Sequence, residues 1–190
     1  MRLLLLGPPG AGKGTQGARL ASALAVQHIA AGDVLRNEVE RKTETGRRAR
    51  RFLRAGELAP DELIIEALMP ALVAAAGRGG YILDGFPRTT PQALELDRIS
   101  GDLSIPLEGA VYLDVPEDEL TRRLLARAEI EGRSDDTPDV IARRLEVFAA
   151  TTRPMVDRYE QREILLTVDG TRPIDEITGE LRDRLAARVS

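Results

Sequence analysis

A glycine-rich loop close to the start of the chain constrains the fold more than any other feature of the sequence. The short apolar run at residues 2–6 leads into this loop at residues 7–15, and a helical pattern begins near Lys13. Glycines allow backbone N–H groups to converge without a clashing Cβ, and the start of a helix adds the positive end of its dipole. Together with the mobile charge of Lys13, this strand, loop and helix predict a cradle for the phosphates of a nucleotide.

The loop departs from the usual phosphate-binding signature at one position. Gly14 follows the lysine, where Ser or Thr is expected, and the hydroxyl group comes one residue later, at Thr15. This displacement of the hydroxyl reduces the number of classes of nucleotide-binding protein to which the chain can belong. The loop is still expected to bind phosphate.

Composition and charge argue against several other classes of protein. The chain of 190 residues fits a single domain, and its net charge of −4 argues against nonspecific binding to nucleic acid. It contains no cysteine, which excludes disulfides and thiolate zinc sites and is compatible with the cytoplasm. The first apolar run is too short for a signal peptide, and no stretch approaches the roughly 20 apolar residues of a membrane span.

Apolar segments alternate with helical patterns along most of the chain. This alternation predicts an α/β fold, with a five-stranded parallel sheet and helices on both of its faces. The expected strands are residues 2–6, 28–30, 81–84, 110–114 and 164–168. The expected helices are residues 13–24, 61–75, 91–99, 117–127, 137–159 with a kink at Pro154, and 173–188.

Two stretches interrupt the alternation. Residues 31–59 are polar, with helices expected at 33–41 and 46–54, so they form a helical insert after the second strand. Residues 128–132 form a short polar break between two helices that carry arginines.

A carboxylate is expected at the carboxyl end of a buried strand, where ligands bind in open α/β sheets. The run Tyr81–Asp84 places Asp84 at this edge. Such an aspartate can hold Mg²⁺, usually through water, beside the phosphates of the glycine loop. On its own a strand-ending aspartate is more often a cap or turn residue, but the preceding phosphate loop favours a role in binding the metal.

His28 has no Ser or Cys partner in a recognisable arrangement, and we interpret it as structural.

Arginines recur at places that favour a role in phosphoryl transfer. Any one of them alone could belong to a solvated helix face, but several lie beside the features already described. Transfer of a phosphoryl group needs positive charge around its oxygens and the exclusion of water, which an arginine-flanked closing segment supplies. The arginines concerned are Arg36, Arg88, Arg123, Arg127, Arg133 and Arg144.

Taken in order, these motifs resemble those of the adenylate kinases, within the family of nucleoside-monophosphate kinases, over the whole chain. The loop with its Lys-Gly-Thr ending is followed by Gln16, as in that family. The other matching segments are residues 31–36, residues 84–88 with Gln92, residues 114–116 with Arg123 and Arg127, residues 132–136, residues 143–145 and residues 168–173.

The resemblance implies a reversible, Mg²⁺-dependent reaction in which ATP and AMP give two ADP, which serves adenine nucleotide homeostasis. It implies one P-loop kinase domain at 1–190, a monophosphate-binding insert near 30–59 and a lid near 126–132. The lid is the short form and the chain lacks cysteine, so no structural zinc is expected. The expected partners are the small-molecule substrates ATP and AMP, and neither nucleic acid nor a membrane is expected to bind. The protein is expected to be a monomer in the cytoplasm.

The resemblance also assigns roles to individual residues. Those expected to bind ATP are Gly10, Ala11, Gly12, Lys13, Gly14, Thr15, Arg127 and Arg172, with Thr15 and Asp84 at Mg²⁺. Those expected to bind AMP are Ala31, Arg36, Glu57, Leu58, Ala59, Gly85, Phe86, Pro87, Arg88, Gln92, Arg133 and Arg144. Those expected to act in catalysis are Lys13, Arg88, Arg123, Arg133 and Arg144.

Two residues of the expected acceptor site favour different bases. Adenylate kinases usually carry Thr where this chain has Ala31, whereas pyrimidine monophosphate kinases tend to carry alanine there and asparagine in place of Gln92. A glutamine amide can donate and accept along an adenine edge, so Gln92 favours AMP. A UMP/CMP kinase remains the alternative within the family, and a P-loop ATPase or switch protein is the alternative outside it.

Overall fold

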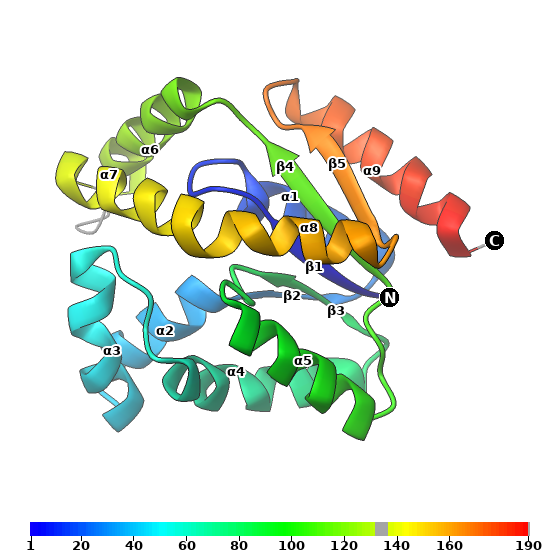
Figure 1. Ribbon diagram of the computed structural model, residues 1–190, viewed down its shortest axis with the longest axis horizontal. Helices are drawn as coiled ribbons and strands as arrows, with labels where there is room; N and C mark the ends of the chain where they lie inside the picture. Colours follow the sequence, from blue (N-terminus) through cyan, green and yellow to red (C-terminus); the bar gives the residue numbers. More distant parts are fainter. Residues whose placement is uncertain (132–136, 190) are drawn as a thin grey trace.

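The computed structural model describes residues 1–131 and 137–189, and a parallel sheet forms its centre (Figure 1). The strands lie in the order β2-β3-β1-β4-β5, and every neighbouring pair is parallel. This confirms the predicted α/β fold. The strands are β1 (Arg2–Leu6), β2 (Gln27–Ala30), β3 (Tyr81–Asp84), β4 (Gly109–Asp114) and β5 (Leu165–Asp169).

Helices connect these strands and supply the insert. The helices of the described residues are α1 (Lys13–Leu24), α2 (Ala31–Glu40), α3 (Glu44–Ala55), α4 (Asp61–Ala76), α5 (Thr90–Asp102), α6 (Glu117–Glu131), α7 (Pro138–Val147), α8 (Arg153–Gln161) and α9 (Ile174–Val189). A π-helical turn at Phe148–Thr152 joins α7 to α8.

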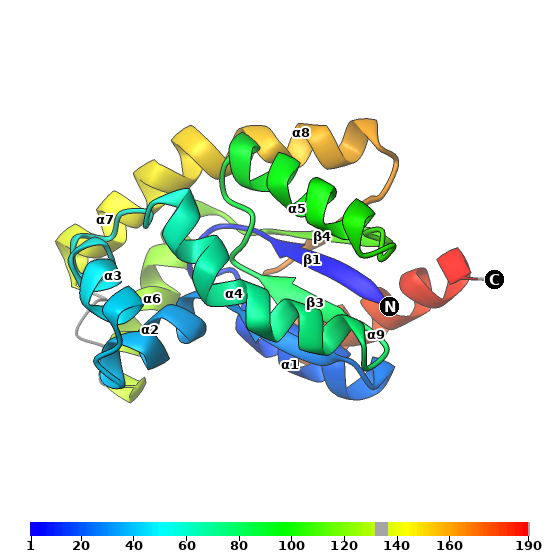
Figure 2. The same cartoon turned by 90° about the horizontal axis from the view of Figure 1, so that it is seen from below.

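The side chains of β1 alternate between two apolar cores, one on each face of the sheet. Leu4 and Leu6 pack into the core that α4, α5 and α8 cover, whereas Leu3 and Leu5 pack into the core that α1 and α9 cover. Figure 2 shows α5 and α8 on one side of the sheet and α1 and α9 on the other. Because side chains alternate along a strand, a strand buried on both faces is apolar throughout, which explains the leucine run of β1.

The strand order reverses around β1. The chain passes from β1 to β2 on one side of the sheet, returns to β3 next to β1, and then crosses to β4 on the other side. A switch of this kind leaves a crevice at the carboxyl ends of the strands, which is the usual ligand site of open α/β sheets. The glycine loop after β1 and Asp84 at the end of β3 both lie at this edge.

Helices α2 and α3 form the insert, at the same end of the molecule as α6 and α7 (Figures 1 and 2). The turn after α3 touches α7, where Arg143 Nη2 donates to Glu57 Oε1 over 3.3 Å. The two elements therefore meet across the opening of the crevice.

The helix that precedes the lid region is longer than predicted. We expected a polar break at residues 128–132, but α6 continues to Glu131. Neither Gly nor Pro occurs between Glu117 and Glu131, and Ala and Glu are good helix formers, so nothing local ends the helix before Gly132.

The helix predicted at 137–159, with a kink at Pro154, is irregular just before that proline. Proline has no N–H to donate and its ring crowds the preceding turn. The backbone responds with the π-helical turn that ends at Thr152, just before Pro154. The Thr151 hydroxyl donates to the Val147 carbonyl over 2.7 Å and so satisfies one carbonyl of this irregular stretch.

None of the helices in the described residues combines the length and the apolar character needed to cross a membrane.

The packing of α2 against α3 depends on the absence of a side chain at Gly46. A Cβ at Gly46 would lie 2.0 Å from the backbone oxygen of Glu38, which cannot move without displacing α2. We expect Gly46→Ala to destabilise the protein by about 1–3 kcal/mol through overpacking. The matched control is Gly179→Ala in α9, where a Cβ meets nothing within 4 Å and stability should rise by about 0.5–1 kcal/mol. Urea unfolding measures both, and equal effects would contradict the packing role.

Candidate active site

The glycine loop turns sharply between β1 and α1 and borders a large cavity. Gly10 and Gly12 have φ angles of +85° and +93°, which L side chains rarely adopt. Gly12 is also the N-cap of α1 and has no side chain to accept from the first turn, so N–H groups of this turn are left for an anion. The predicted loop residues from Gly10 to Thr15 all line this cavity of about 890 Å³.

Lys13 lies at the centre of this loop. Its ammonium group donates to the carbonyl oxygens of Gly7 and Pro8, over 2.8 Å and 2.9 Å. Burial lowers the pKa of Lys13 to about 8; the carboxylate of Asp84 opposes this, and nearby arginines such as Arg88 add to it. The lysine is therefore a cation that the protein alone stabilises poorly and that a phosphate would stabilise well.

Asp84 faces the same cavity from the end of β3. It is 9% exposed, and the Nε2 atom of His28 lies 3.8 Å from its Oδ2 atom. Burial opposes ionisation of the carboxyl group, but the imidazole of His28 and the charges of Lys13 and Arg88 outweigh it and lower the pKa of Asp84. Asp84 is thus ionised at neutral pH, as a magnesium ligand must be.

His28 has room beside Asp84 because residue 17 is a glycine. A Cβ at Gly17 would lie 2.4 Å from the Nε2 atom of His28. The histidine that the sequence indicated as structural therefore also contacts the carboxylate of the site. No motif marks this pair, because the two residues meet only when β2 and β3 pair in register.

Arginines from separate elements surround the cavity. Arg36 comes from α2, Arg88 from the turn after β3, Arg123 and Arg127 from α6, and Arg144 from α7. The structure therefore brings together the predicted arginines except Arg133, which lies outside the described residues.

Arg88 is held from two sides. Its Nε atom donates to the carbonyl of Gly85 over 2.7 Å, and its own carbonyl accepts from the Thr152 hydroxyl over 3.1 Å. Burial and then the charge of Arg144 lower the pKa of the Arg88 guanidinium. The π-helical turn that ends at Thr152 thus reaches the site, a contact that no sequence pattern indicated.

Glu119 holds two arginines of α6 that face the cavity. Its carboxylate accepts from Arg122 and from Arg123, whose Nε atom lies 2.6 Å from Oε1. These hydrogen bonds lower the pKa of Glu119 to about 2. Sequence reasoning missed Glu119, although its i, i+3 and i, i+4 spacing to the two arginines was available as a signal.

A second, smaller cavity of about 60 Å³ adjoins the first between the insert and the sheet. The predicted residues Ala31, Glu57, Leu58, Ala59 and Gln92 line it. Three arginines, Arg36, Arg88 and Arg144, line both cavities. They form a shared wall of positive charge, which we call the arginine wall.

The turn after β3 contributes unequally to the two cavities. Gly85 and Pro87 line the larger one, whereas the side chain of Phe86 is 4% exposed and packs into the apolar core with Leu83. Phe86, which we expected at the monophosphate, lines neither of these cavities.

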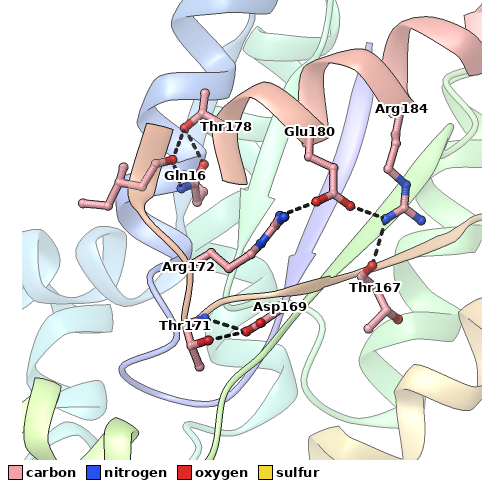
Figure 3. A network of polar contacts seen from close by, with 9 residues as sticks. Gln16, Thr167, Asp169, Thr171, Arg172, Thr178, Glu180 and Arg184 are labelled. Atoms are coloured by element: carbon pink, nitrogen blue, oxygen red, sulfur yellow. Dashed lines mark hydrogen bonds and ion pairs between the residues drawn. The ribbon is translucent and has the colours of Figure 1, made fainter. Parts of the chain in front are cut away.

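The turn after β5 also lines the larger cavity, through Gly170, Thr171 and Arg172. Figure 3 shows the polar contacts around this turn. The Arg172 guanidinium pairs with Glu180, which also accepts from Arg184 Nη1 over 2.9 Å. Glu180 therefore holds the side chain of Arg172, a residue that lines the larger cavity.

Gln16 ties α1 to the same turn. Its side chain donates to the Ile174 carbonyl over 3.0 Å and accepts from the Thr178 hydroxyl over 2.8 Å (Figure 3). Gln16 is 2% exposed, so these bonds fix the glycine loop and the start of α9 relative to each other.

The pKa of Lys13 predicts how triphosphate binding depends on pH. Bound phosphates should raise this pKa, so above pH 8 binding should take up a proton and affinity should fall by up to tenfold per pH unit. Phosphate itself has lost its last proton near pH 6 and should contribute little. Titration calorimetry of ATP in buffers of different ionisation enthalpy measures the proton uptake. Lys13→Met should bind weakly with no uptake at any pH; equal uptake in both proteins would contradict the assignment.

Comparisons with known proteins agree with this geometry. The model of the adenylate kinase family matches residues 5–164. The adenylate kinase of Thermus thermophilus is 46% identical over 183 residues, which cover 96% of each chain. That of Xylella fastidiosa is 45% identical over 178 residues, covering 94% of this chain and 95% of the relative. That of Kocuria rhizophila is 46% identical over 177 residues, covering 93% and 94%. The chain therefore belongs to the adenylate kinase family.

Proposed function

We propose that this protein transfers a phosphoryl group reversibly from ATP to AMP and so forms two ADP. The observation that carries the proposal is the arginine wall, because Arg36, Arg88 and Arg144 line both cavities. A donor nucleotide in the larger cavity and an acceptor whose base enters the smaller one would meet with their phosphates at this wall. The names and sequences of the relatives support the same activity.

In this reaction an oxygen of the AMP phosphate attacks the γ-phosphorus of ATP. The bond from that phosphorus to the bridging oxygen breaks, and the bridging oxygen stays with the new ADP. The chain provides little covalent chemistry, so its task is to position the phosphates and stabilise the charge on the transferring group. Lys13 and the first turn of α1 would bind the donor phosphates, and the arginine wall would bind the acceptor phosphate and the group in transfer. Arg123, Arg127 and Arg133 would add charge as the lid closes.

Mg²⁺ fits the residues at the end of β3. Asp84 is a buried, ionised carboxylate, and the exposed Thr15 lines the same cavity. The described residues contain no group of three or more His, Cys, Asp or Glu that could cage a metal. This suits Mg²⁺, which keeps several waters and binds through one or two protein oxygens together with substrate phosphates. When bound, the ion would supply positive charge to the phosphate oxygens of the donor.

The remaining roles follow from position. Residues 30–59 would bind the monophosphate, with Ala31, Leu58 and Ala59 at its base, and the region near 126–132 would close over ATP. Arg172 would border the donor adenine. The protein would act on these small molecules as a cytoplasmic monomer, as the family and the absence of cysteine suggest.

A pyrimidine monophosphate kinase is the second candidate, and Ala31 is the observation that favours it. Ala31 is 2% exposed and lines the smaller cavity, and none of the described residues that line this cavity carries a hydroxyl group. The loss of one neutral hydrogen bond costs about 0.5–1.5 kcal/mol, which an adenine-specific site can tolerate.

The function is tested with a panel of acceptors. With ATP and Mg²⁺, we expect kcat/KM to be highest for AMP, and turnover of ATP without any monophosphate to be negligible, because only the acceptor completes the site. Product analysis by chromatography measures both. A higher kcat/KM for CMP or UMP would establish the second candidate, and rapid ATP hydrolysis without acceptor would indicate an ATPase.

Arg88 is expected to act on the acceptor and on the transferring group. Arg88→Ala should raise KM for AMP about tenfold and lower kcat roughly 100-fold, with KM for ATP almost unchanged. The control is Arg98→Ala on α5, which removes an exposed arginine paired with Glu95 and Asp102 and should change little. Steady-state kinetics with each substrate varied in turn measures the split. An effect confined to ATP would refute the acceptor role.

A further inference from the structure

The side-chain amide of Gln92 is held by a contact at each of its two polar atoms. Its Oε1 atom accepts from the backbone N–H of Arg88 over 2.7 Å. Its Nε2 atom donates to Asp61 Oδ1, also over 2.7 Å. Gln92 is 3% exposed, so water does not compete strongly for these contacts.

These partners allow only one orientation of the amide. If the oxygen and nitrogen exchanged places, Nε2 would face the Arg88 N–H, donor against donor. At the other end Oε1 would face the carboxylate of Asp61, acceptor against acceptor. Arg88 N–H can only donate and an ionised carboxylate can only accept, so the hydrogen bonds themselves determine the orientation.

The start of α5 adds to this constraint. Thr89 is the N-cap of α5, and its hydroxyl accepts from the backbone N–H of Gln92 over 3.3 Å. The Gln92 side chain reaches back in turn to the chain before the cap, as in the capping box that pairs Thr at the N-cap with Gln at the third helical position. The same hydroxyl lies 3.4 Å from Asp61 Oδ2.

The fixed orientation leaves a defined pair of groups for a ligand. One N–H of Nε2 and one lone pair of Oε1 are not used by Asp61 or Arg88. Gln92 lines the smaller cavity, and among the described residues that line it, Gln92 is the one with a neutral polar side chain. A base in this cavity therefore meets a donor next to an acceptor, in a fixed order.

This order separates the nucleobases into two classes. Adenine and cytosine present a ring nitrogen that accepts beside an amino group that donates, and these match the free N–H and the lone pair. Guanine and uracil present a ring N–H that donates beside a carbonyl oxygen that accepts, and these match only the reversed amide.

We propose that Asp61, the first residue of α4, is a positioning residue that fixes the Gln92 amide and so selects amino-bearing bases over oxo-bearing bases. Asp61 does not line the smaller cavity, so it acts through Gln92 rather than on the base itself. The inference rests on the proposed function, because it assumes that the smaller cavity holds the acceptor base. The fixed orientation of the Gln92 amide matters more for base selection because Ala31 offers the base no hydroxyl group.

The test compares acceptors in the wild type and in variants at the start of α4. In the wild type, kcat/KM should be much higher for AMP and CMP than for GMP and UMP. Asp61→Ala removes one of the two contacts that orient the amide. It should raise KM for AMP about tenfold, leave kcat within about twofold, and lower the AMP-to-GMP ratio of kcat/KM about tenfold. KM for ATP should not change.

Two controls separate positioning from a general effect on α4. Asp61→Asn can still accept from Nε2 but can also donate to a reversed amide, so it should lower the AMP-to-GMP ratio less than Asp61→Ala does, by no more than about threefold. Glu62→Ala removes the neighbouring carboxylate from the same helical turn, where Glu62 is exposed, and should leave the ratio unchanged. If Asp61→Ala does not fold, Asp61→Ser replaces it, because serine keeps a polar side chain at the start of α4 but is too short to reach Gln92.

The outcomes distinguish the inference from the proposed function. A wild type that does not transfer phosphate to AMP contradicts the proposed function. A wild type that uses AMP, but whose AMP-to-GMP ratio is unchanged in Asp61→Ala, or equally lowered in Glu62→Ala, overturns the role of Asp61 alone. Equal use of GMP and AMP by the wild type also overturns it.

Discussion

Positive charge held away from water is the constraint on which the rest of this structure depends. Lys13 and Arg88 are both partly buried, and this burial lowers the pKa of each. Asp84 offsets part of this charge, but arginines from α2, α6 and α7 outnumber it around the cavity. A site of this kind is unfavourable when empty and becomes favourable when polyanionic phosphates enter. The rigid sheet and the cores on its two faces supply the stability that offsets this cost.

The contacts that aim these cations come from elements far apart in the chain. Gln16 fixes the glycine loop to α9 over 158 and 162 positions of sequence, and Thr152 fixes the backbone of Arg88 over 64. The insert meets α7 through Glu57 and Arg143, so the two sides of the opening are already in contact. The site is therefore a property of the assembled fold rather than of any single motif.

The sequence was sufficient wherever a feature is local. The glycine loop, the strand before it and the position of Asp84 follow from spacing and residue type, and the parallel sheet follows from the alternation of strands and helices. It was insufficient wherever a feature depends on neighbours in space. The contact of His28 with Asp84, the burial of Phe86 in the core and the hydrogen bond from Gln92 to Asp61 have no signature along the chain. The prediction of a break at residues 128–132 was wrong for a different reason. The polar residues there were interpreted as a break, although their helix propensity is high and α6 continues to Glu131.

The double use of Gln92 limits how this site can change in evolution. Its side chain closes the start of α5 and also faces the acceptor cavity, so replacing it alters the helix end and the ligand preference together. Position 31 carries only a methyl group in the same cavity; it packs into the apolar core, but its side chain holds no hydrogen bond that a replacement would break. Descendants or engineered forms with a new base preference are thus more accessible through position 31, with the amide and its carboxylate kept as a fixed frame.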